Sequence, residues 1–155
     1  MEDYIKQGAR NHIHNLEGFD HMELTTLEEG RAVVKVKTET GFANTRNFIH
    51  GGALMALCDM TSSAAVYSYG KRNVTLQCNF NFEHGVAVDD NAEMTCEAIV
   101  VHNGRQTVVV ETKVMDANGR ICVRATFTQF IVQIMGPEDE IPMTPTQKAA
   151  LDNAQ

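Results

Sequence analysis

A single carboxylate, Asp59, lies inside an otherwise apolar run that extends from residue 53 to residue 69. The density of apolar side chains in this run predicts a helix that is buried on most sides. An ionised carboxylate in such a helix costs several kcal/mol unless a partner compensates it. Asp59 is therefore either satisfied structurally, with Ser62 and Ser63 as candidate hydrogen-bond partners, or retained for chemistry.

Two glycines, Gly51 and Gly52, open the same run. They let a ligand approach the backbone closely, and the first turn of a helix offers unpaired N–H groups to a developing negative charge. This is the requirement for an oxyanion hole, although a tight turn without a ligand is the alternative interpretation. Gly51 and Asp59 are eight positions apart, about 12 Å along a helix, and cannot both reach one carbonyl group. If both act on one substrate, Asp59 comes from a second copy of the chain in a symmetric dimer.

The composition excludes several classes of protein. The 155 residues suit one domain, and 43% hydrophobic with 21% charged residues is typical of a globular protein. The net charge of −7 disfavours binding to nucleic acid or to an anionic membrane. The chain starts without a secretory signal and has no run of ~18 apolar residues, so we expect a cytoplasmic protein that is not embedded in a membrane.

Neither a metal site nor a serine triad is predicted. The four cysteines form no C-x-x-C pair and are expected to be small core residues: Cys58, Cys78, Cys96 and Cys122. His12 and His14 would share one face of a strand, but no carboxylate or cysteine completes a ligand set at a familiar spacing. The G-x-S-x-G motif is absent.

The elements that must position Asp59 follow from periodicity. Residues 74–82 alternate strictly between apolar and polar side chains, which predicts a strand with one covered face. The other predicted strands are 19–27, 31–38, 92–100, 107–115 and 121–132, with a short leading helix at 3–15. The Asn-Gly pairs 103–104 and 118–119 predict hairpins. The result is an α+β architecture in two layers, followed by a tail from residue 136 in which 146–152 could form a short helix.

The triplet His50-Gly51-Gly52 at the start of a buried helix, an acid nine residues after the histidine, and six strands in this order resemble a hot-dog-fold thioesterase of the phenylacetic-acid-degradation and 4-hydroxybenzoyl-CoA type. The resemblance covers residues 15 to 132. It implies a hot-dog domain over residues 1–135, with a long central helix wrapped by a six-stranded antiparallel sheet, and an appended segment over residues 136–155.

The resemblance also implies roles for individual residues. The Gly51 N–H is the oxyanion donor, and Asp59 of the partner subunit is the acid. Asn44 helps to hold the thioester or the attacking water, Thr75 places a hydroxyl near the acid, and His50 shapes the turn and contacts the thioester carbonyl. Whether Asp59 attacks directly or acts as a general base stays open, and we favour the general base.

In similar proteins coenzyme A follows the segment after the third strand and the next hairpin. Here these contain Gly85 in the first segment and His102, Asn103, Gly104 and Arg105 in the second. Arg105 is the first candidate for a phosphate contact, with an ordinary solvated charge as the alternative. Coenzyme A enters only as part of the substrate, and no cofactor is expected.

The expected function is hydrolysis of an acyl-CoA or aryl-CoA thioester in a homodimer with shared sites, assembled further as a homotetramer. One alternative is a noncatalytic acyl-CoA sensor, which would be expected to lack Asp59. A hot-dog dehydratase or hydratase is a second alternative, but the position of the acid relative to His50 fits a thioesterase better. The acyl group is not fixed by the sequence; candidate pocket residues, which could equally be core, are Met55, Met60, Tyr67 and Tyr69.

Overall fold

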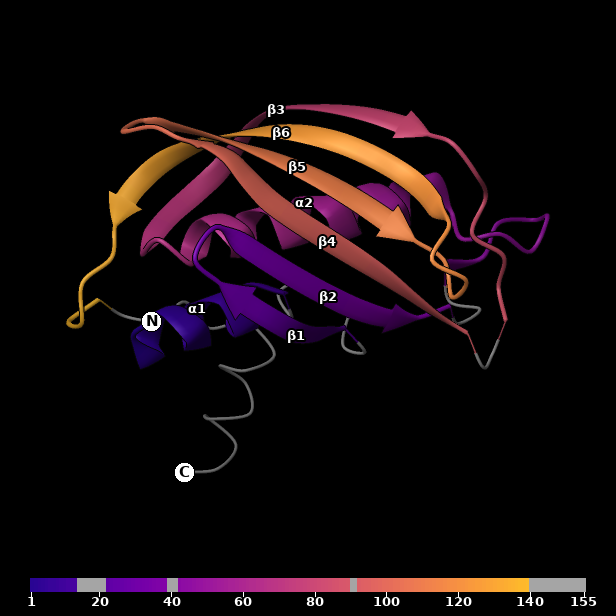
Figure 1. Cartoon of the computed structure of the whole chain (residues 1–155), viewed down its shortest axis with the longest axis horizontal. Coiled ribbons are helices and arrows are strands. Elements are labelled where there is room, and N and C mark those ends of the chain that lie inside the picture. Colours follow the sequence, from indigo (N-terminus) through magenta and orange to yellow (C-terminus); the bar gives the residue numbers. More distant parts are fainter. Residues whose placement is uncertain (14–21, 39–41, 90–91, 140–155) are drawn as a thin grey trace.

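The computed structural model describes residues 1–13, 22–38, 42–89 and 92–139 (Figure 1). The elements found there are α1 (Asp3–Ile13), β1 (Glu23–Glu28), β2 (Arg31–Lys37), α2 (Gly51–Tyr67), β3 (Lys71–Phe82), β4 (Glu93–Asn103), β5 (Thr107–Met115) and β6 (Ile121–Ile134). The predicted α+β architecture is confirmed: the sheet curves around α2, and α1 packs on α2 beside β1 (Figure 1). The helix predicted at 146–152 and the side chain of His14 lie outside the described residues.

The central helix α2 begins at Gly51, two residues before the apolar pattern predicts, and ends at Tyr67. All residues from 60 to 67 are buried, so the second half of the helix is covered on every side. The first half leaves one stripe open, in which Gly52 and Met55 are exposed and Asp59 is half-buried. The expectation that Asp59 is buried is therefore corrected, because its side chain is half-buried. Within this chain, the acid lies where a solvent-facing stripe meets the covered half of the helix.

All neighbouring strands of the sheet run antiparallel, in the order β1-β2-β4-β5-β6-β3. The predicted hairpins β4–β5 and β5–β6 are confirmed, and β6 is two residues longer than the pattern predicts. The edge strands are β1 and β3, and β3 is 12 residues long. Three cysteines are buried as expected, but Cys78 on β3 is exposed.

A β-bulge at Leu76 changes the register of β3 against β6. Thr75 pairs with Gln129, whereas Gln77 pairs with Thr128, so one extra residue lies between the two pairs. Thr75 therefore faces α2 on the same side of the sheet as the inward-facing residues further along the strand. The strict alternation predicted for this strand, which placed Thr75 on the face opposite its apolar neighbours, is wrong at this point.

Candidate active site

The start of α2 has one backbone donor that the described residues leave without an acceptor. His50 is the N-cap, and its Nδ1 accepts a hydrogen bond from Gly52 N at 3.2 Å. The next two amides, Ala53 N and Leu54 N, donate to His50 O at 2.9 and 3.2 Å. The amide of Gly51 remains, at the positive end of the helix dipole. His50 thus caps the helix through Gly52, and the Gly51 N–H stays available to an acceptor from outside the described residues.

Asn44 stabilises the loop that leads into this helix. Its Oδ1 accepts hydrogen bonds from Arg46 N at 2.9 Å and from Phe48 N at 3.2 Å, which closes a turn around Asn47, whose φ is 59°. His50 N completes the loop by donating to Phe42 O at 2.7 Å. Because the carbonyl oxygen of Asn44 is occupied, its amide nitrogen is the group that could donate to a ligand. Asn44, His50 and Gly51 therefore lie together.

Asp59 is held by Thr75, whose Oγ1 donates to Asp59 Oδ1 at 2.5 Å. The serines considered in the sequence do not reach this carboxylate. Ser62 Oγ donates to the backbone carbonyl of Asp59 at 2.8 Å, and Ser63 Oγ donates to Asn73 Oδ1 at 2.9 Å. One oxygen of the carboxylate is thus oriented by a hydroxyl, and the half-buried side chain remains open to the uncovered stripe of α2.

Gln129 is a residue of this site that sequence reasoning missed. It lies on β6, is fully buried, and connects Ser62 with Thr75. Alternation along β6 was the available signal, because Gln129 has the same parity as the inward-facing Ala125 and Phe127. A polar amide at a core position requires partners, and such partners often belong to a functional network.

The residues expected to contact coenzyme A lie at the surface. Gly85 packs against Phe48, and a Cβ on Gly85 would lie 2.7 Å from the Phe48 ring, so a larger residue there would displace that ring. His102, Asn103 and Arg105 are exposed on the β4–β5 hairpin.

Lys71 of β3, which was not predicted from the sequence, contacts the same hairpin. Lys71 Nζ donates to Asn103 Oδ1 at 2.5 Å and to Gly104 O at 3.0 Å. Lys71 and Arg105 thus place two cations at this end of the sheet.

The candidate acyl-pocket residues separate into two groups. Met60 and Tyr67 are buried core side chains, and burial raises the pKa of the Tyr67 hydroxyl. Met55 is exposed on the open stripe of α2.

His12 is part of α1 rather than a strand and packs on Tyr67 with 5.4 Å between the ring centroids. Burial lowers the pKa of His12, which favours the neutral ring. Among the described residues, no group of three or more His, Cys, Asp or Glu side chains could hold a metal ion.

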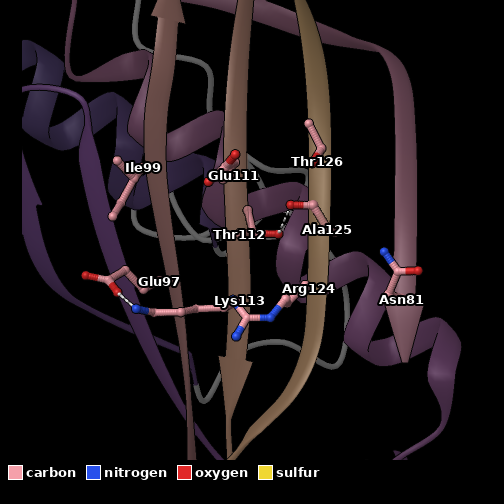
Figure 2. Close-up of a pocket in the computed structure, with 9 residues that line it drawn as sticks. All are labelled: Asn81, Glu97, Ile99, Glu111, Thr112, Lys113, Arg124, Ala125 and Thr126. Carbon is pink, nitrogen blue, oxygen red and sulfur yellow. Dashed lines mark hydrogen bonds and ion pairs between the residues drawn. The ribbon is translucent and has the colours of Figure 1, made fainter. Parts of the chain in front are cut away.

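A hollow on the opposite face of the sheet is lined by charged side chains (Figure 2). Glu97 lies there between Lys113 and Arg31, with Nζ–Oε2 and Nε–Oε1 distances of 2.7 and 2.8 Å. Arg124 pairs with Glu83 at 3.0 Å. These residues alternate with core residues along their strands, so the hollow faces away from α2 and contains none of the predicted site residues.

The described chain therefore separates the candidate residues into two groups, here called half-sites. Asn44, His50 and Gly51 lie at the start of α2, whereas Asp59 lies two turns further along the same uninterrupted helix, where Thr75 of β3 donates to it. The rise of an α-helix separates the Gly51 N–H from Asp59 by about 12 Å, so one chain does not bring them to one bond.

No helix in the described part of the chain is long and apolar enough to cross a bilayer.

Comparison with known proteins identifies the family. The model of the thioesterase superfamily matches residues 46–123, which include the N-terminus of α2, Asp59 and Thr75. A hypothetical thioesterase from Streptococcus pneumoniae TIGR4, in a structure with coenzyme A, is 32% identical; the match covers 76% of this chain and 94% of that one with a TM-score of 0.73. A protein from Streptococcus mutans UA159, bound to acetyl-CoA, is 28% identical over 81% of this chain and 100% of that one, with a TM-score of 0.74.

The PaaI protein of the Escherichia coli phenylacetic acid degradation operon has the same fold, with a TM-score of 0.77 at 22% identity over 85% of this chain and 96% of that one. Variants of the pneumococcal protein carry alanine in place of an aspartate and of a threonine that lies sixteen positions further along. The chain thus belongs to the thioesterase superfamily and is a thioester hydrolase with the hot-dog fold.

Proposed function

We propose that the chain hydrolyses the thioester of an acyl-CoA or aryl-CoA to the free acid and coenzyme A. The observation that carries this proposal is the pairing of two features on α2: the Gly51 amide without an acceptor in the described residues, and Asp59 held by Thr75. Two similar proteins bound to coenzyme A and acetyl-CoA support the substrate class. Asp59 and Thr75 are separated by the same sixteen positions as the two residues substituted in the pneumococcal protein, which supports assigning this pair to the site.

In the proposed reaction, Asp59 acts as general base on a water molecule. As the water oxygen bonds to the thioester carbonyl carbon, its proton moves to Asp59 and the carbonyl oxygen becomes an oxyanion. The Gly51 N–H, assisted by the helix dipole, donates to this oxyanion. The carbon–sulfur bond then breaks, and the departing thiolate of coenzyme A takes the proton from Asp59. Direct attack by the carboxylate, through a mixed anhydride, is the second route.

Both half-sites are completed in this proposal by a second copy of the chain. The unpaired edge of β3 supports such an assembly, because a long edge strand exposes unpaired backbone groups to another chain. Leu76 and Phe82 on this strand are 63% and 52% exposed, so a second copy that docks here would cover apolar surface. A two-fold axis at this edge would bring β3 of one chain against β3 of the other, so that both chains use the same surface. The dimer of dimers expected from the sequence stays a prediction.

The proposal is tested by assaying the protein against acetyl-, hexanoyl-, phenylacetyl- and benzoyl-CoA. We expect hydrolysis of at least one substrate by the wild type. Binding of these thioesters without release of coenzyme A would support the sensor alternative and contradict the proposed hydrolysis.

Mixing two inactive variants tests the shared site. Asp59→Asn removes the base, whereas Asn44→Asp removes the amide donor but keeps an oxygen for the loop amides of Arg46 and Phe48. Mixed dimers would contain one site with both defects and one site with neither, so we expect activity to return after the two variants are unfolded together and refolded. Absence of recovery from a mixture that forms dimers would contradict a site shared in this way.

A further inference from the structure

Asp59, Ser62, Gln129 and Thr75 form a ring of polar groups within hydrogen-bond distance of one another, and the ring joins α2, β3 and β6. Gln129 Nε2 on β6 donates to Ser62 Oγ at 2.7 Å, and Ser62 Oγ donates to the backbone carbonyl of Asp59 at 2.8 Å. On the other side, Thr75 Oγ1 of β3 lies 3.1 Å from Gln129 Oε1 and 2.5 Å from Asp59 Oδ1. Gln129 is thus the single side chain that links both supports of Asp59, one on its backbone and one on its carboxylate.

The ring contains more acceptors than the Thr75 hydroxyl can serve at one time. This hydroxyl has one hydrogen, while Asp59 Oδ1 and Gln129 Oε1 both lie within hydrogen-bond distance of it. When Asp59 is ionised, it is the stronger acceptor and takes the hydrogen. After Asp59 has accepted a proton, its need for a donor falls, and Gln129 Oε1 is already in place as the second acceptor.

The cost of placing Gln129 in the core argues for a role beyond packing. Its amide is fully buried, and a buried amide must have partners to offset the loss of its hydration. An apolar residue would fill the same position on β6 without this requirement. The bulge at Leu76 is the second feature that serves the ring, because it is what turns Thr75 inward to meet Gln129.

We propose that Gln129 is a positioning residue of the thioesterase reaction: it holds Thr75 and Ser62 against Asp59 and accepts the Thr75 hydroxyl hydrogen while Asp59 carries the proton taken from water. This proposal rests on the function proposed above. Gln129 itself does not touch the substrate and acts entirely through Thr75 and Ser62.

The test begins with Gln129→Met, which keeps the length of the side chain and removes the amide. We expect kcat to fall about 10- to 100-fold, the loss typical of a displaced reactive group, with KM changed less than twofold. Gln129→Glu keeps an acceptor for Thr75 but adds a charge. In that variant the acid limb of the pH–rate profile should move to higher pH, since a second negative charge disfavours ionisation of a neighbouring carboxylate. Thr112→Val is the matched control: Thr112 is also buried on the inner face, but its hydroxyl donates to Ala125 O.

A double-mutant cycle separates positioning from a general loss of stability. If Gln129 acts through Thr75, then Gln129→Met should cost much less kcat in a Thr75→Val background than in the wild type. The same pair is measured by urea unfolding, where the shift in midpoint caused by Gln129→Met should also shrink in that background. Equal losses of kcat in both backgrounds, or an unmoved pH profile in Gln129→Glu, would overturn the proposal. If the wild type hydrolyses none of the thioesters, the proposed function fails. The ring is tested independently of activity: equal shifts of the urea-unfolding midpoint by Gln129→Met in the wild-type and Thr75→Val backgrounds would show that Gln129 does not act through Thr75.

Discussion

At the scale of single residues, Asp59 is where structural and chemical roles can be separated. Among the described residues, its carboxylate accepts a hydrogen bond from Thr75 alone, and its side chain remains half-buried beside the open stripe of α2. A carboxylate kept only for structure would be expected to have more of its oxygens satisfied by the fold. Ser62 and Ser63 have other partners, so the alternative in which they satisfy the carboxylate has lost its support.

The first prediction concerns this residue. Asp59→Asn keeps the shape of the side chain and an oxygen for Thr75, but it cannot accept a proton or attack a carbonyl. Turnover should therefore fall by about 10²–10⁴, the range for loss of a general base, with little change in thermal stability. Steady-state hydrolysis of the best acyl-CoA and circular-dichroism melting measure the two quantities. Glu29→Gln, at the exposed β1–β2 turn, serves as control; near-normal turnover in Asp59→Asn would reject the catalytic assignment.

Arg105 carries the second prediction. Because its guanidinium is exposed on the β4–β5 hairpin, Arg105→Ala should weaken binding of an acyl-CoA about tenfold, as roughly 1.4 kcal/mol of phosphate contact would give. Binding of a short acyl thioester without the nucleotide should be unchanged. Calorimetric titration of both ligands, with Arg10→Ala on α1 as the control, tells these cases apart. Equal losses for the two ligands would leave Arg105 as a solvated charge.

At the scale of elements, the two faces of the sheet are stabilised differently. The inner face packs on α2 with aliphatic side chains, whereas the outer face carries a row of ion pairs around Glu97. The hydrogen bond from Lys113, with a further contribution from Arg31, holds the pKa of Glu97 below its usual value. Since the folded-state pKa is lowered, this stabilisation is complete above the usual glutamate pKa of about 4.3 and is lost as the pH falls through the lower folded value.

The third prediction follows from the lowered pKa of Glu97. Glu97→Gln should reduce the free energy of unfolding by about 1 kcal/mol at pH 7, and the difference from the wild type should shrink as the pH falls below about 4.3. Urea unfolding at pH 7 and at pH 3 measures this change. Glu111→Gln is the control, because Glu111 is exposed on the same face and forms no ion pair with the described residues. A difference that stays constant with pH would show that Glu97 stabilises the sheet in another way.

The sequence predicted these elements from local patterns. The central helix was recognisable from its density of apolar side chains, the strands from alternation or from β-branched runs, and the meander of β4, β5 and β6 from its Asn-Gly turns. The bulge at Leu76 was not, because the letters around it alternate perfectly and only pairing with β6 reveals the extra residue. Gln129 was missed for a related reason: its importance depends on two partners that are distant in sequence, Ser62 and Thr75.

At the scale of the whole molecule, the geometry of α2 requires a second chain if Gly51 and Asp59 are to act on one bond. The described chain contains every proposed group of the reaction, yet it separates the donor of Gly51 from the acid of Asp59 by about 12 Å. One chain therefore supplies all the proposed groups but does not bring them to one substrate bond. The exposed edge of β3 is the surface on which we expect the second copy to dock.

The fourth prediction tests this surface. Leu76→Lys places a charge on the edge of β3 and should yield a folded monomer that has lost hydrolysis, because an edge charge opposes strand pairing. Sedimentation at assay concentration, together with circular dichroism, gives the oligomeric state and the fold. Ile99→Lys is the matched control on β4, an interior strand, where Ile99 is also exposed. This variant should keep at least a dimer and its activity. A fully active monomer of Leu76→Lys would reject the shared site.

The extra residue in β3 also determines where relatives of this chain can gain or lose a residue in this strand. Because Leu76 lies between Thr75 and Gln77, residues 73–75 and residues 77–82 hold separate registers against β6. Loss of Leu76 would straighten the strand and leave both registers as they are. A deletion upstream, between the end of α2 and Thr75, would instead carry a different side chain into the place beside Asp59. Relatives of this chain are therefore expected to tolerate gains and losses of one residue at position 76, while the length from Asp59 to Thr75 stays fixed.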